Sequence, residues 1–144
     1  MIKSQTYISH SPDETFIFGK KLGASLGGGE VLALYGALGA GKTALVQGIA
    51  AGLGLKNKVN SPTFAIMKLY SVKGEKIKQL CHIDAYRLNE AQELVAIGAG
   101  DYLGRFDTVS AVEWPEKVET VLPVNFIIIH LRTKSETIRE IIIS

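Results

Sequence analysis

Hydrophobic side chains occur along the chain in blocks of two kinds, and the clearest pair of blocks lies in the first half of the sequence. Residues 31–35 form an unbroken apolar run without a turn residue, which is typical of a strand covered on both faces. Leu45, Ile49 and Leu53 then recur four residues apart, as they do on one face of a helix. The pattern therefore predicts a strand, a loop and a helix that ends at Gly54.

The pattern before this unit predicts a short edge strand over residues 5–9, followed by a helix. Ser11 is the expected N-cap of that helix, Pro12 its first residue, and Glu14 the second member of a capping box. After the central unit, the apolar segments and the turn residues between them predict strands over residues 64–72, 76–86, 108–112, 125–132 and 137–143, and a helix over residues 89–97 that is capped by Asn89 and closed by Gly98.

Two of the predicted connections, residues 72–75 and 133–136, are so short that the strands they join must be antiparallel. The central strand, by contrast, leads through a loop into a helix, as strands of a parallel sheet do. We expect an α/β fold, in which a mixed sheet with a parallel centre and antiparallel additions is flanked by helices. A length of 144 residues fits one domain, residues 1–144.

The loop of the central unit reads GALGAGKT over residues 36–43 and satisfies the pattern G-x-x-x-x-G-K-[ST] at every required position. Glycines allow successive backbone N–H groups to converge on phosphate oxygens, and the start of the following helix attracts the anion. Lys42 is expected to contact the β- and γ-phosphates, and the Thr43 hydroxyl to coordinate Mg²⁺. The predicted nucleotide-binding positions on this loop are Gly36, Leu38, Gly39, Ala40, Gly41, Lys42, Thr43 and Ala44. A plain glycine-rich turn with a solvated lysine is disfavoured, because strand, loop and helix occur in the required order.

Two carboxylates stand at predicted strand ends, Asp84 after an apolar run and Glu113 after the strand over residues 108–112. The carboxyl ends of parallel strands lie beside the phosphate loop, so both acids are expected near the phosphates. One acid can serve the metal while the other polarises the attacking water. We predict Thr43, Asp84 and Glu113 as metal-side residues, and Glu113 with Lys42 as catalytic residues.

Three further residues allow two interpretations each. Thr63 lies 20 residues beyond Thr43 and either senses the γ-phosphate through the metal or only sets the entry to the next strand. Arg87 contacts phosphate or pairs with a nearby carboxylate. Trp114 is a packed residue beside Glu113, or an aromatic that lies on the base or meets a partner.

Composition and charge argue against several classes of function but indicate no further binding site. A formal net charge of +2 is too small to indicate a nucleic-acid groove or a membrane surface. Cys81 is the only cysteine, which excludes an intramolecular disulfide and suits a reducing compartment. The three histidines lack the spacing of metal ligands, and no apolar run approaches the length of a membrane span. We therefore expect a cytoplasmic protein.

Taken together, the motifs GALGAGKT, SPTF, HIDAYRL and VEWP, in that order between residues 36 and 115, resemble the TsaE (YjeE) family. The resemblance implies a cytoplasmic ATPase that binds ATP or ADP with Mg²⁺ and hydrolyses ATP slowly alone. It also implies a function with the TsaD–TsaB pair in the threonylcarbamoyladenosine modification of tRNA. The matching site residues are Lys42 and Thr43 for phosphate and Mg²⁺, Asp84 for the metal, Glu113 for hydrolysis, Trp114 at the site, and Thr63 in a switch-like loop.

The chain differs from the family pattern at Ala37, where aspartate is common, and at Ala44, where a second threonine is common. Two other functions fit the phosphate loop, namely a non-catalytic nucleotide switch and a small-molecule kinase. A kinase needs an acceptor pocket and a lid with arginines, but only Arg87 and Arg105 lie in the middle of the chain. We expect a protein that is monomeric or weakly self-associating alone and does not bind membranes. The net charge does not predict a direct contact with tRNA.

Overall fold

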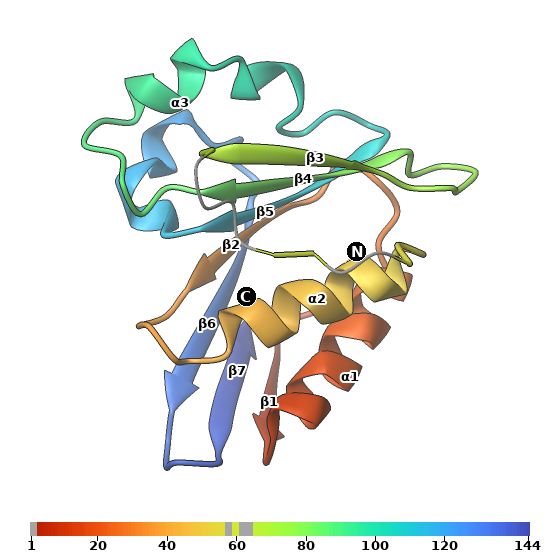
Figure 1. Ribbon diagram of the computed structural model, residues 1–144, viewed down its shortest axis with the longest axis vertical. Helices are drawn as coiled ribbons and strands as arrows, with labels where there is room; N and C mark the ends of the chain where they lie inside the picture. The colour runs from red at the N-terminus through yellow and green to blue at the C-terminus, as the bar shows by residue number, and fades with distance from the viewer. Residues whose placement is uncertain (1–2, 57–58, 61–64) are drawn as a thin grey trace.

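The computed structural model describes residues 3–56, 59–60 and 65–144, and all seven strands belong to one sheet (Figure 1). In chain order the strands are β1 (Gln5–Ser9), β2 (Val31–Tyr35), β3 (Met67–Ser71), β4 (Gln79–Asp84), β5 (Thr108–Glu113), β6 (Ile127–Thr133) and β7 (Arg139–Ile143). The α-helices are α1 (Pro12–Ala24), α2 (Lys42–Gly52) and α3 (Gln92–Ala96), and three short 3-10 helices are η1 (Ala99–Asp101), η2 (Pro115–Lys117) and η3 (Glu119–Val121).

The sheet has the strand order β1-β7-β6-β2-β5-β4-β3. Its centre is parallel, because β2 pairs in parallel with both β5 and β6, and β4 pairs in parallel with β5. Strand β3 pairs antiparallel with β4, and β7 pairs antiparallel with both β6 and β1. The predicted mixed sheet with a parallel centre and antiparallel additions is therefore confirmed.

Helices lie over both faces of the sheet (Figure 1), and each face carries its own buried apolar cluster. Helices α1 and α2 pack on one face, where Leu22 and Ile49 belong to the same buried cluster as Leu32 and Leu34 of β2. Helix α3 and the 3-10 helices cover the other face, whose cluster includes Ala33 of β2. Because successive residues of β2 point to opposite faces, its unbroken apolar run is buried on both sides, as the sequence pattern predicted.

Helices α1 and α2 approach each other closely through small residues. An added Cβ at Gly48 would lie 2.2 Å from the carbonyl oxygen of Phe16, and one at Gly23 would lie 2.3 Å from that of Ile49. Glycines on both helices are spaced four residues apart, at Gly19 and Gly23 and at Gly48 and Gly52, which lines them along the contact. The contact brings the first turns of α1 and α2 to the same end of the fold, where the phosphate loop lies.

Several predicted boundaries need correction. The strands predicted over residues 125–132 and 137–143 begin two residues later, at Ile127 and Arg139. The strands predicted over residues 64–72 and 76–86 are shorter, and the first of them begins at Met67. The helix predicted over residues 89–97 begins only at Gln92, with Ala91 and not Asn89 as its N-cap. The Glu93 carboxylate accepts the backbone N–H groups of Asn89 and Glu90 and holds them in a turn before the helix. The predicted helix-closing glycine, Gly98, does adopt the left-handed conformation.

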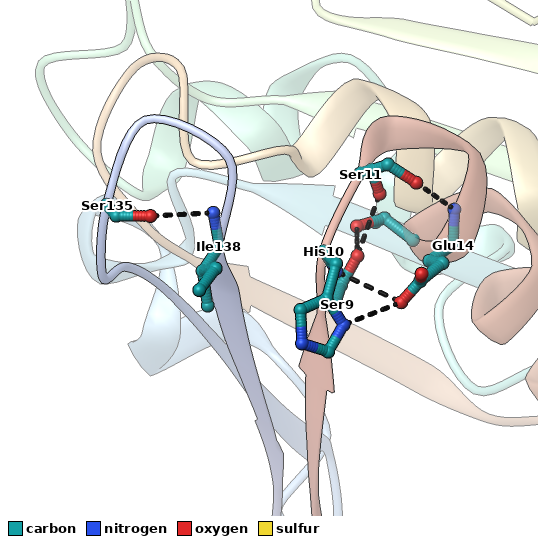
Figure 2. A network of polar contacts seen from close by, with 7 residues as sticks. Ser9, His10, Ser11, Glu14, Ser135 and Ile138 are labelled. Carbon is teal, nitrogen blue, oxygen red and sulfur yellow. Dashed lines mark hydrogen bonds and ion pairs between the residues drawn. The ribbon is translucent and has the colours of Figure 1, made fainter.

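The capping box at the start of α1 is shifted by one residue. The Ser11 hydroxyl accepts the backbone N–H of Glu14 at 3.1 Å, as predicted. The Glu14 carboxylate, however, accepts the backbone N–H of His10 at 3.0 Å, whereas a capping box requires the N–H of the N-cap itself. The His10 ring contacts the same carboxylate oxygen at 3.0 Å, which explains the displacement (Figure 2).

Candidate functional site

The phosphate loop connects β2 to α2 and ends at the first turn of α2. Gly41 is the N-cap residue, with φ of 100°, and no side chain caps the helix within the described residues. Gly39 also has a positive φ of 79°, a conformation that costs glycine little and other residues more. The first amide groups of α2 therefore remain available to an anion.

The loop residues predicted to bind nucleotide differ in their placement. Gly39, Gly41, Lys42, Thr43 and Ala44 line a cavity of about 660 Å³ beside the loop. Leu38 also lines it but exposes 77% of its surface, so a contact with phosphate would come from its backbone. Gly36 and Ala40 are not among the lining residues of this cavity. Gly36 instead supports the loop from behind, because an added Cβ would lie 2.9 Å from the carbonyl oxygen of Leu131.

Lys42 carries a buried ammonium group in this cavity. The residue is only 6% exposed, and its Nζ has no hydrogen-bond partner in the part of the chain that the structure describes. Burial lowers the pKa of Lys42 from its ordinary value, although the nearby carboxylates of Glu113, Glu116 and Asp84 act in the opposite direction. A buried cation without an acceptor is costly unless an anion joins it, so this atom favours an anionic ligand in the cavity.

Asp84 and Glu113 lie side by side, as the position of both at the ends of parallel strands predicted. They are register partners at the last rung of the β4–β5 ladder, and both line the cavity. The Asp84 Oδ1 accepts the backbone N–H of Tyr86 at 3.0 Å. The Glu113 Oε2 lies 2.6 Å from Nε2 of His82. The structure thus brings Lys42, Thr43 and the two acids to one cavity.

The oxygen atoms at this cavity fit a magnesium ion bound together with phosphate. The described residues contain no group of three or more histidine, cysteine or acidic side chains arranged to hold a metal. Mg²⁺ rarely needs such a cage, since it commonly binds one or two protein oxygens, several waters and substrate phosphates. The Thr43 hydroxyl and the Asp84 carboxylate supply oxygens of this kind at the same cavity.

Trp114 closes one side of the cavity in a strained backbone conformation. Its φ of 57° is the one positive value among the described non-glycine residues, and a bulky residue rarely adopts it. The indole ring lies 3.9 Å from the Lys42 Nζ, measured to the ring centroid, and packs 5.0 Å from the Tyr86 ring. Trp114 is therefore placed at the cavity, and its ring contacts the phosphate-loop lysine.

Two contacts around the phosphate loop were not predicted from the sequence. The Arg139 guanidinium at the start of β7 donates to the carbonyl oxygen of Gly39, with an Nη2–O distance of 3.1 Å. The start of α1 also borders the cavity through Pro12. The Ser9 hydroxyl holds this turn, since it contacts the Thr15 hydroxyl at 2.7 Å and donates to the carbonyl oxygen of Ser11; Figure 2 shows Ser9 beside Ser11. The contact of Arg139 with Gly39 joins residues 100 positions apart, and Pro12 borders a cavity whose other lining residues begin at Leu38. No local motif predicts either placement.

One predicted site residue cannot be placed. Thr63 lies outside the described residues, so its two interpretations stay open. In the described part of the chain, no helix has the length and apolar character that crossing a membrane requires.

The comparisons with known proteins agree with one another. The family model for the threonylcarbamoyl adenosine biosynthesis protein TsaE matches residues 9–141. The tRNA threonylcarbamoyladenosine biosynthesis protein TsaE of Treponema pallidum is 36% identical over 138 residues, which cover 95% of this chain and 98% of that protein. The Bacillus subtilis protein of the same name is 37% identical over 131 residues, covering 91% of this chain and 79% of that protein.

A solved structure is also similar along the whole chain. The crystal structure of YdiB from Bacillus subtilis matches with a TM-score of 0.76 and 32% sequence identity, covering 100% of this chain and 87% of that one. This likeness confirms the predicted α/β phosphate-loop fold. Sequence motifs, family model, relatives and fold all lead to one assignment: the chain belongs to the TsaE family.

Proposed function

We propose that this protein binds MgATP at the cavity beside the phosphate loop and hydrolyses it slowly, in support of the threonylcarbamoyladenosine modification of tRNA. The observation that carries the proposal is the joint placement, at one cavity, of two adjacent carboxylates and a buried ammonium that has no hydrogen-bond partner among the described residues. Lys42 supplies the ammonium, and Asp84 and Glu113 the carboxylates. An anion that also carries a divalent cation suits this site, because the anion pairs with the ammonium and the cation pairs with the carboxylates.

The binding roles follow from the placement of the residues. The free N–H groups at the start of α2 and the Lys42 ammonium would hold the phosphates. The Thr43 hydroxyl and Asp84 would hold Mg²⁺, which would neutralise charge on the phosphate oxygens. ATP binding would also give the buried Lys42 Nζ an acceptor, which it does not find in the described part of the chain. ATP or ADP is therefore the ligand we assign to this cavity.

Glu113 is the residue to which we assign hydrolysis. It is only 4% exposed, lines the cavity, and is the last residue of β5, next to Asp84. A carboxylate in this position can orient a water and accept its proton, while Asp84 serves the metal. A second carboxylate beside Asp84 favours an ATPase over a nucleotide switch, which needs binding alone.

The biological role rests on the relatives. Those of Treponema pallidum and Bacillus subtilis are named tRNA threonylcarbamoyladenosine biosynthesis proteins. We propose that this protein acts in the cytoplasm with proteins of the TsaD and TsaB type, and that ATP hydrolysis supports their catalytic cycle. Stimulation of ATP turnover by these partners, and loss of modified tRNA when this protein is omitted, are the expected results. If neither occurs, this role is wrong.

The decisive test within the chain is Glu113→Ala. Loss of a general base typically costs a factor of about 10² to 10⁴ in rate, so turnover should fall by about 100-fold or more. The affinity for MgATP should stay close to the parental value, because the phosphate-binding groups remain. Phosphate release measures the rate, and titration calorimetry measures the affinity. Hydrolysis at the parental rate would contradict the role of Glu113 and favour the switch.

A further inference from the structure

His82 lies directly behind Glu113, and nothing in the function proposed above uses it. Its side chain is 1% exposed, and its Nε2 lies 2.6 Å from the Glu113 Oε2. Both partners are buried, so the contact is shielded from competing water. A hydrogen bond between a ring nitrogen and a carboxylate in such surroundings is short and strong.

The strand geometry explains why these two side chains meet. Along β4, His82 and Asp84 are two residues apart and therefore point to the same face of the sheet. Asp84 is the register partner of Glu113 on β5, so His82 is a diagonal neighbour of Glu113. The carboxylate of Glu113 thus has the cavity on one side and the imidazole on the other.

The environment of the ring indicates which atom donates. The His82 Nδ1 is buried and has no hydrogen-bond partner in the part of the chain that the structure describes. A proton on Nδ1 would leave a buried N–H without an acceptor, which costs more than a buried lone pair without a donor. The ring is therefore best satisfied when Nε2 carries the proton and donates to the carboxylate.

We propose that His82 is a positioning residue for Glu113, fixing the rotamer of the carboxylate that orients the attacking water. The inference rests on the proposed ATP hydrolysis and adds to it a residue that never touches ATP. A carboxylate on a flexible two-carbon stem has several rotamers, and a buried hydrogen bond selects one of them. Small displacements of a catalytic group cost up to about 100-fold in rate, so the effect should appear in kcat rather than in binding.

The test compares two amide substitutions at one position. In His82→Gln, the side-chain amide can place its N–H near the position of Nε2, and in His82→Asn the amide is one methylene too short to reach Glu113. We expect His82→Asn to lower the single-turnover rate of ATP hydrolysis about 10- to 100-fold. We expect His82→Gln to recover most of that loss, and both variants to keep the parental affinity for MgATP within about threefold.

Two controls separate positioning from folding. Ser110→Ala removes a buried hydroxyl from β5 on the opposite face of the sheet, beside Cys81, and should leave rate and affinity unchanged. The melting temperature of each variant reports on the fold. The fluorescence of the single tryptophan, Trp114, reports on MgATP binding independently of turnover.

A double substitution links the effect to Glu113. In a Glu113→Gln background, His82→Asn should cause no further loss of rate, because the group that it positions has already lost its charge. Equal losses of rate in His82→Gln and His82→Asn, a parallel loss of MgATP affinity, or additive effects with Glu113→Gln would each overturn the proposal. Failure of Glu113→Gln itself to slow hydrolysis would instead refute the function proposed for Glu113, so the two failures are distinguishable.

Discussion

The first turns of α1 and α2 lie next to each other, yet they satisfy their backbone N–H groups in opposite ways. Helix α1 has a serine cap, a proline as its first residue and two acidic residues in its first turn. Helix α2 has a glycine cap in the left-handed conformation, and its described first turn contains no capping side chain and no acidic residue. One helix start is complete within the chain, whereas the other is left for a ligand.

The difference shows how a fold assigns stability and function to similar elements. Acidic side chains near a helix N-terminus stabilise the helix through its dipole, and Asp13 and Glu14 supply them in α1. The same charges in α2 would repel a phosphate and occupy the free amides. In their place α2 begins with Lys42, whose Nζ is buried without a hydrogen-bond partner among the described residues. The start of α2 can therefore bind an anion because it lacks the cap and the acidic side chains that stabilise the start of α1.

The largest expected effect comes from Lys42→Ala, which removes the cation from the start of α2. Truncation of one partner of a buried charge pair costs about 2–5 kcal/mol, so the affinity for MgATP should fall by about 30-fold or more. The melting temperature without nucleotide should not decrease, since the variant removes a buried ammonium for which the described residues supply no acceptor. Titration calorimetry and thermal melting measure the two quantities. The matched control is Lys20→Ala on the exposed side of α1, which should change neither.

Much of this contrast can be predicted from sequence, because both helix starts depend on local residues. Ser11 and Pro12 mark the start of α1, and the glycines of residues 36–41 with Lys42 mark the start of α2. The meeting of Asp84 and Glu113 was also predictable, since it needs only the rule that parallel strands end at one edge. These features depend on spacing along the chain or on a single rule of sheet geometry.

The remaining features depend on three-dimensional register and on side-chain rotamers, which no local pattern encodes. The contact of His82 with Glu113 joins the neighbouring strands β4 and β5. The contact of Lys42 with Trp114 requires an unusual φ at Trp114. The bond from Arg139 to the Gly39 carbonyl joins residues 100 positions apart. A weaker signal was present for the close approach of the two helices, namely glycines spaced four apart on both.

An intermediate effect is expected from Ser11→Ala, which makes the start of α1 resemble that of α2 by removing its cap. Loss of a serine N-cap costs about 1 kcal/mol of stability, and the Glu14 N–H that Ser11 accepts would lose its partner. Urea unfolding measures the change, with Ser4→Ala at an exposed position as the control. The affinity for MgATP should stay within about twofold. A loss of affinity as large as that of Lys42→Ala would show that the two helix starts are not independent.

The smallest effect concerns pH and the displaced capping bond of Glu14. Hydrogen bonds from the His10 backbone N–H and the His10 ring lower the pKa of Glu14 below its ordinary value of 4.5. A lowered folded-state pKa stabilises the protein above the unfolded-state pKa, and this contribution is lost as the pH falls through the folded-state value. Glu14→Gln keeps an oxygen acceptor but loses the charge, so its melting temperature should be slightly lower than the parental one at pH 7. The difference should shrink below about pH 4.5, whereas a difference that stayed constant down to pH 3 would mean that Glu14 acts only through shape. Asp13→Asn, which removes the adjacent carboxylate and leaves both bonds of His10 in place, separates this effect from the general attraction of the helix dipole for acids.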